Sequence, residues 1–240
     1  MRLAAPFVLT LALLACLTGP AQAEDIRASY DVRLLGLPVG KMRFAAREEA
    51  GAYAVTGVFD TSGIGRIVEA GFRLSAQGRD RQGRLTPQAY DERIDTGSRQ
   101  STASLRYKGG VPRITGGSVA AEVAQDPGAL DPATQGGTVD PMTALWGVLR
   151  DRPLQGLCSY DVTIFDGQRR ARLAMTGRRD GAGQVICTGA YTRLAGFSAS
   201  EMKRQSIYPF AVTYTPTGTL MRAQALTVKS AYGTAEMTRD

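Results

Sequence analysis

Residues 30–45 read YDVRLLGLPVGKMRFA, and their alternation decides the class of fold. Tyr30, Val32 and Leu34 are apolar, whereas the two residues between them are charged. Such a period of two is typical of a β-strand with one buried face. The Gly36-Leu37-Pro38 segment predicts a turn, and residues 39–45 then predict a second strand. The stretch therefore predicts an antiparallel hairpin.

The same alternation recurs along the chain in short runs that are separated by Gly, Asp or Pro. The further predicted strands are 53–59, 72–76, 88–94, 102–107, 159–165, 169–176, 184–193, 205–214 and 220–232. A meander of antiparallel strands is the simplest arrangement of such runs. We therefore expect an all-β, mainly antiparallel fold, either a curved meander sheet or a partly open β-barrel or half-barrel.

Residues 140–151 predict one amphipathic helix packed against this sheet. Asp140 can cap the helix and Pro141 suits its first position. Apolar side chains then recur on one face, namely Met142, Leu145, Trp146 and Leu149. We expect this stripe to plug the open side or end of the sheet; the alternative is a role for Trp146 in gating a ligand. The preceding residues 116–137 have little periodicity and predict a long surface loop.

The N-terminus predicts export. Arg2 is followed by the uncharged run 3–17, and Ala21-Gln22-Ala23 then precede Glu24. This order is typical of a signal peptide, residues 1–23, cleaved between Ala23 and Glu24. We expect residues 24–240 to form a single β-rich domain, periplasmic or secreted, and not transmembrane after processing, because the apolar run is too short. The alternative is a lipoprotein anchored through Cys16.

Only Cys158 and Cys187 remain once the predicted leader is removed. Two thiols in an oxidising compartment predict a disulfide between them. Two buried free thiols, or a redox pair, are the alternatives, although redox pairs normally show the closer C-x-x-C spacing.

The chain contains no histidine, which removes several classes of site. Ser-His-Asp and Cys-His nucleophiles are excluded, as are zinc and haem sites that need histidine. Acids such as Asp91, Glu92 and Asp95 could form a catalytic pair, but acids that alternate in a strand and turn usually face the solvent. An enzyme that uses carboxylates or a serine nucleophile remains the alternative. We expect no catalytic, cofactor-binding or metal-binding residues, and a protein that is not an enzyme.

The chain is basic, with a formal net charge of +7 and 29 Lys and Arg against 22 Asp and Glu. Its arginines are scattered along the alternating segments, and the few close groups, such as Arg169-Arg170 and Arg178-Arg179, flank predicted turns. We interpret this charge as a solvated surface; attraction to anionic lipid or lipopolysaccharide headgroups is the alternative. The scatter and the predicted export both argue against nucleic acid as a partner.

Several motifs together resemble a known family. They are Tyr30-Asp31-Val32, Gly36-Leu37-Pro38-Val39-Gly40, Asp140-Pro141-Met142-Thr143-Ala144-Leu145, Phe165-Asp166-Gly167-Gln168-Arg169-Arg170, and the late Cys187-x-Gly189 with Tyr191 and Gly196-Phe197. Their order and spacing look like the exported bacterial domain of unknown function 3108 (DUF3108) family. The resemblance implies an envelope-associated, β-rich domain similar in style to half-barrels that cup acyl chains. It implies no activity and no catalytic residues.

Two functions fit these observations. The first is a non-enzymatic binding or carrier module for a lipid-like or amphiphilic component of the cell envelope, since a curved sheet can enclose a ligand on its inner face. Its candidate ligand-facing residues are Trp146, Arg169, Arg170, Tyr191 and Arg193. The alternative is a structural or protein-interaction component of the envelope, with a filled core and no small-molecule ligand.

Overall fold

The computed structural model describes residues 24–62, 71–95 and 100–240. The predicted signal peptide, including Cys16 and Ala23, lies outside the described residues. None of the described helices is long and apolar enough to cross a membrane.

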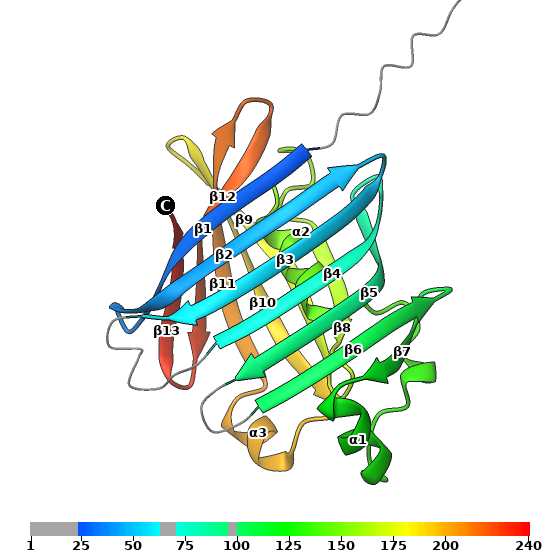
Figure 1. The fold of residues 1–240 in the computed structure, drawn as a ribbon. Coiled ribbons are helices and arrows are strands. Elements are labelled where there is room, and N and C mark those ends of the chain that lie inside the picture. Colours follow the sequence, from blue (N-terminus) through cyan, green and yellow to red (C-terminus); the bar gives the residue numbers. More distant parts are fainter. Residues whose placement is uncertain (1–23, 63–70, 96–99) are drawn as a thin grey trace, which may run out of the picture.

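Thirteen strands of the described chain form one antiparallel sheet (Figure 1). They are β1 (Glu24–Leu34), β2 (Leu37–Glu49), β3 (Ala52–Thr61), β4 (Gly71–Arg81), β5 (Arg84–Asp95), β6 (Gln100–Lys108), β7 (Val111–Gly116), β8 (Tyr160–Phe165), β9 (Arg170–Gly181), β10 (Gln184–Ala195), β11 (Ile207–Thr217), β12 (Leu220–Ser230) and β13 (Gly233–Arg239). Strands that follow each other in the chain are neighbours in the sheet, except β7 and β8, and β1 pairs in addition with β13. The predicted all-β, antiparallel meander is confirmed.

The pairing of β1 with β13 joins the two ends of the chain and leaves β7 and β8 as the edges of the sheet. Val32 lies opposite Met237 in this pairing. Because β7 and β8 are not paired with each other in the described chain, the sheet is curved and open and is not a closed barrel.

Two-residue turns set the register of the first hairpins. Leu35 and Gly36 have φ of 53° and 79°, and Gln82 and Gly83 have φ of 55° and 88°. Two consecutive positive φ values are the signature of the type I′ turn, whose twist matches that of paired strands. The turn predicted at Gly36-Leu37-Pro38 is therefore shifted by one residue, and Pro38 lies inside β2.

The helix α2 (Pro141–Leu149) occupies the concave side of the sheet. In Figure 1 it lies behind β3 and β4, and it contacts β8 and β12 from the other half. Asp140 caps it as predicted, because Asp140 Oδ1 accepts a hydrogen bond of 2.7 Å from the Thr143 backbone N–H. The helix ends at Leu149, two residues before the predicted end, because Arg150 is extended.

The prediction of a continuous loop over 116–137 was wrong in two places. The segment contains α1 (Ser118–Gln125) and the short 3₁₀ helix η2 (Pro132–Thr134). Helix α1 forms because Val119 is buried and because Ser118 N–H donates to Thr102 Oγ1 of β6 at 2.9 Å. A third helix, α3 (Ala199–Arg204), begins with a capping box between Ser198 and Glu201, which the alternation of apolar residues does not reveal.

One hydrophobic core spans both halves of the sheet and α2. The largest fully buried side chains include Tyr30, Tyr90 and Tyr214 from the strands and Met142 and Trp146 from the helix. The helix therefore plugs the curved sheet, as predicted, but its burial is not confined to the predicted stripe: Ala144, Gly147 and Val148 are buried as well, and Leu145 is only half-buried.

Candidate functional site

The centre of the molecule is filled. Trp146 is 2% exposed, and its Nε1 donates a 3.0 Å hydrogen bond to Glu48 Oε1 of β2. Tyr214 of β11 donates through its hydroxyl to the Val148 carbonyl at 2.6 Å. These contacts tie α2 to both halves of the sheet, and they place Trp146 in the core, away from the cavities described below.

A buried polar network starts at the N-terminus of α2. Thr143 Oγ1 lies 2.7 Å from Asp140 Oδ2 and 2.8 Å from the Tyr53 hydroxyl. Asp140 is fully buried, and this burial raises the pKa of its carboxyl to about 7, although the hydrogen bonds from Thr143 lower it. The network fixes the start of the helix, and no cavity reaches Asp140 among those described here.

A pocket of about 420 Å³ lies beside this helix start, between the inner face of β4–β6 and the β8–β9 turn. We call it the end pocket. Its apolar wall consists of Phe72, Leu74, Tyr90, Ile94, Val119, Pro141 and Tyr191. Glu92 and Ser101 lie among these residues on the sheet, opposite Leu74 and Ile94. The polar wall is the β8–β9 turn, with Asp166, Gln168 and Arg169. A largely apolar cavity with a few polar groups is typical of a small-molecule site, and its volume lies within the usual range.

A carboxylate, an amide and a guanidinium define the polar wall. Asp166 Oδ1 accepts hydrogen bonds from the backbone N–H groups of Gln168 at 2.9 Å and Arg169 at 2.7 Å. Burial raises the pKa of Asp166, and these two hydrogen bonds oppose the shift. Arg169 is ion-paired with Glu201 at 3.3 Å. On the sheet side of the pocket, Glu92 Oε2 accepts from the Tyr90 hydroxyl at 2.5 Å.

Arg193 lies close to the polar wall, but its contacts stabilise the packing of α3. Its Nη1 donates to the carbonyls of Glu201 at 2.7 Å and Gln205 at 2.9 Å, at the end of α3. Its guanidinium also lies over the Phe197 ring, 4.8 Å from the centroid, and over the Tyr208 ring at 5.1 Å. Arg193 therefore holds α3 on β10 and β11.

The five candidate ligand-facing residues thus separate into four groups. Arg169 and Tyr191 line the end pocket, and Arg193 lies behind it under α3. Trp146 belongs to the core. Arg170 is half-buried outside the pocket lining, and its Nε has no hydrogen-bond partner in the described part of the chain.

The apolar wall of the pocket was only partly foreseeable. The alternation over 72–76 predicts which residues of β4 face inward, but not that Tyr191 lies across from them. Val119 was not predicted as a pocket residue, because residues 116–137 were predicted to form a loop. Asp166 lies in the predicted Asp166-Gly167 turn. Aspartate is common in turns, so its presence there did not indicate a pocket residue.

Helix α3 also contains an S-x-x-K spacing, Ser200 and Lys203. Both residues are exposed, and Ser200 Oγ lies 3.0 Å from Ser198 Oγ. A serine nucleophile activated by lysine requires a desolvated amine held against the hydroxyl. This exposed pair lacks that environment.

A second, larger cavity of about 590 Å³ lies between the β4–β5 turn and the edge strand β8. Its lining includes Arg84, Leu85, Tyr160, Asp161 and Val162. Asp161 is ion-paired to Arg172 on β9. Polar and backbone atoms make up much of this lining, so it matches an apolar ligand less well than the end pocket does.

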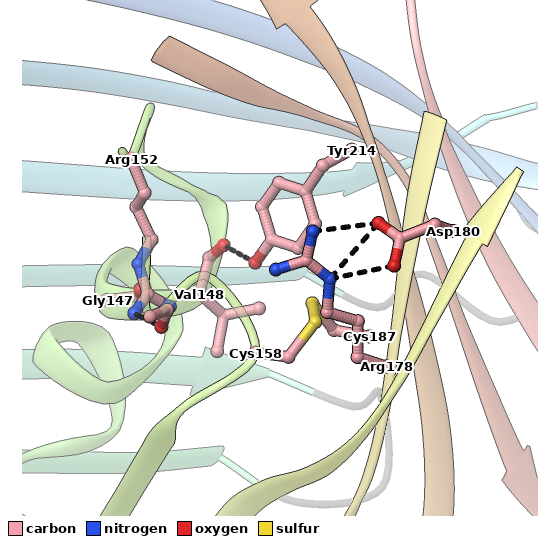
Figure 2. Close-up of a disulfide and its surroundings, with 9 residues drawn as sticks. Gly147, Val148, Arg152, Cys158, Arg178, Asp180, Cys187 and Tyr214 are labelled. Atoms are coloured by element: carbon pink, nitrogen blue, oxygen red, sulfur yellow. Dashed lines mark hydrogen bonds and ion pairs between the residues drawn. A yellow bond between two sulfur atoms is a disulfide. The ribbon is translucent and has the colours of Figure 1, made fainter. Parts of the chain in front are cut away.

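The predicted disulfide between Cys158 and Cys187 is present (Figure 2). It joins the segment after α2 to β10 with a Cα–Cα distance of 5.1 Å. Cys187 is fully buried, and Figure 2 shows the bridge close to Tyr214 and Val148. The bond therefore fastens the C-terminal side of α2 to the second half of the sheet. A disulfide is typical of an oxidising, extracytoplasmic compartment.

Comparison with known proteins gives one match. A family model described as "Protein of unknown function (DUF3108)" matches residues 29–186, which is more than half of the chain. The motif at Cys187, Gly189 and Tyr191 lies beyond the matched residues. No curated protein and no solved structure matches the chain. The extent of the family match shows that the chain belongs to the DUF3108 family.

Proposed function

We propose that this DUF3108 protein is a non-enzymatic binding module that takes a small amphiphile of the cell envelope in its end pocket. The observation that carries the proposal is a cavity of about 420 Å³ in which a mainly apolar sheet face lies across from a polar turn with Asp166 and Arg169. The leader-like N-terminus and the Cys158–Cys187 disulfide support export to the periplasm or beyond.

The polar wall indicates the kind of headgroup. Asp166 presents a carboxylate to the pocket, whereas the guanidinium of Arg169 is shared with Glu201. A headgroup that donates hydrogen bonds, such as an ammonium or a hydroxyl, therefore fits better than a carboxylate or phosphate. The tail of the amphiphile would lie against Phe72, Leu74 and Tyr191, where it loses its contact with water.

Calorimetric titration with dodecylamine and with dodecanoate tests this proposal, because the two differ only in the headgroup. We expect saturable binding at one site, with dodecylamine the tighter ligand. Ile94→Trp, which fills the pocket, should abolish binding. Leu194→Trp is the matched control, because Leu194 is 45% exposed and outside the pocket lining, and it should bind as wild type does.

The filled centre of the molecule favours the alternative, a structural or protein-interaction component of the envelope without a small-molecule ligand. The titration separates the two functions. A folded wild-type protein that binds neither amphiphile contradicts the binding-module proposal and supports this alternative. Binding that survives Ile94→Trp contradicts the end pocket as the binding site.

A further inference from the structure

Arginines that are scattered along the sequence gather on one face of β4–β7. Three pairs lie directly opposite each other on adjacent strands: Arg73 with Arg93, Arg81 with Arg84, and Arg106 with Arg113. All six are exposed. They alternate with buried residues such as Leu74, Leu85 and Leu105, so they lie on the face turned away from α2, which is toward the viewer in Figure 1. We call these six residues the arginine patch.

Like charges directly opposite each other destabilise a sheet, because their Cβ atoms are only about 5 Å apart. Within the described chain, the only ion pair recorded for the patch joins Arg106 to Asp91. The other five guanidinium groups have no carboxylate within salt-bridge distance among the described residues. Three such pairs on four strands form a surface whose repulsion an anionic partner would relieve.

The shape and composition of this face indicate the kind of anion. The patch lies on the broad outer surface of the sheet, outside the linings of the end pocket and, except for Arg84, of the cavity at β8. None of the exposed residues in β4–β7, all of which the structure describes, is aromatic. Single-stranded nucleic acids are usually held by stacking on aromatic rings, so this surface lacks their main contact. A two-dimensional array of headgroups requires only charge on a broad face.

We propose that the arginine patch is a docking surface for the anionic headgroups of a lipid membrane. Each guanidinium can bind a phosphate oxygen through paired N–H donors. The proposal is independent of the end pocket, which opens on the opposite, concave side of β4–β6.

Sedimentation with lipid vesicles tests the proposal. The purified protein is mixed with vesicles of phosphatidylcholine alone, or of phosphatidylcholine with an equal amount of phosphatidylglycerol. We expect binding only to the anionic vesicles, weakened by added salt. The triple variant Arg73→Gln, Arg93→Gln, Arg113→Gln should bind these vesicles roughly a hundredfold more weakly, on the basis of the usual contribution of each arginine at such a surface.

A charge-matched control separates the patch from net charge. Arg33→Gln, Arg179→Gln, Arg204→Gln removes the same three charges outside β4–β7 and should bind almost as wild type does. The single variant Arg73→Gln should melt at or above the wild-type temperature, because it removes one like-charged pair. Failure of the wild type to bind anionic vesicles at low salt, equal loss in both triple variants, or patch-dependent binding of a short DNA duplex without vesicle binding would each overturn the proposal.

Discussion

The buried carboxyl of Asp140 should make the stability of this protein fall as the pH rises from 4 to 7. Its pKa is about 7 in the folded protein, against 3.8 for an unperturbed aspartate, because the group is completely buried. Over this range the folded state keeps a proton that the unfolded chain releases. Each pKa unit between the folded and the unfolded state corresponds to about 1.4 kcal/mol in the free energy of unfolding. Ionisation of Asp140 therefore lowers this free energy by about 4 kcal/mol in total, and the loss is constant above pH 7.

Asp140→Asn isolates this effect. The amide can accept from the Thr143 N–H and donate to Thr143 Oγ1, so the helix cap is retained while the titration is removed. In urea unfolding with the disulfide intact, we expect the variant to gain on the wild type as pH rises, and to be more stable by about 3–4 kcal/mol at pH 8.

Two controls bracket the result. Asp140→Ala removes the cap and should lose about 1 kcal/mol or more at low pH, where the wild-type carboxyl is protonated. Asp161→Asn should shift the pH dependence in the opposite direction, because Arg172 lowers the pKa of Asp161 and its contribution is lost as pH falls. Parallel stability curves for wild type and Asp140→Asn from pH 4 to 8 would refute the reasoning.

Three further perturbations test the packing around α2. Replacing Cys158 and Cys187 with Ala should lower the free energy of unfolding by about 3–4 kcal/mol, measured in urea, and an unchanged midpoint would show that the bridge adds nothing. Gly147→Ala should cost about 1–3 kcal/mol, because its Cβ would lie 2.1 Å from the Tyr160 hydroxyl. Tyr160→Phe should rescue little of this loss, because ring carbon Cζ of residue 160 would still lie 2.4 Å from the new Cβ. Tyr160→Ala removes the ring, so adding Gly147→Ala to it should cost almost nothing, and a full additional loss in that double variant would contradict this contact. Trp146→Phe should cost about 1–3 kcal/mol because Glu48 Oε1 loses its hydrogen-bond donor. Tryptophan fluorescence of the folded wild type with its maximum at the wavelength of the unfolded protein would contradict burial of the indole.

The local pattern of this sequence predicts its hairpins and its central helix. Tyr30 and Met42 alternate with charged neighbours and are buried as expected. Asp140 and Pro141 mark the start of α2 because capping is a local requirement. The disulfide follows from cysteine count and compartment, which do not depend on tertiary structure.

The parts that depend on long-range pairing could not be predicted in this way. Nothing within β1 indicates that Val32 pairs with Met237, because both strands have the same alternation as their hairpin partners. The end pocket combines β4 and β5 with the β8–β9 turn and Tyr191 of β10, and it exists only after that pairing closes the two halves around α2.

The grouping of the arginines on one face of the sheet also depends on long-range pairing and could not be predicted. In the sequence the arginines are scattered, which we interpreted as a solvated surface. Register brings Arg73 opposite Arg93, and the two-residue Gln82-Gly83 turn brings Arg81 opposite Arg84. The clustering of these arginines could not be predicted from the sequence, because it depends on turn length and on the bulge between Gln77 and Gly78.

Hydrogen exchange of the native protein tests most directly whether one curved sheet, joined by β1 and β13, folds around α2. We predict that amides of α2, such as Ala144 N–H bonded to the Asp140 carbonyl, exchange as slowly as those of paired β1 and β13, with all of them limited by global unfolding. Rapid exchange in α2 or β13 while β2–β5 remain protected would contradict the account.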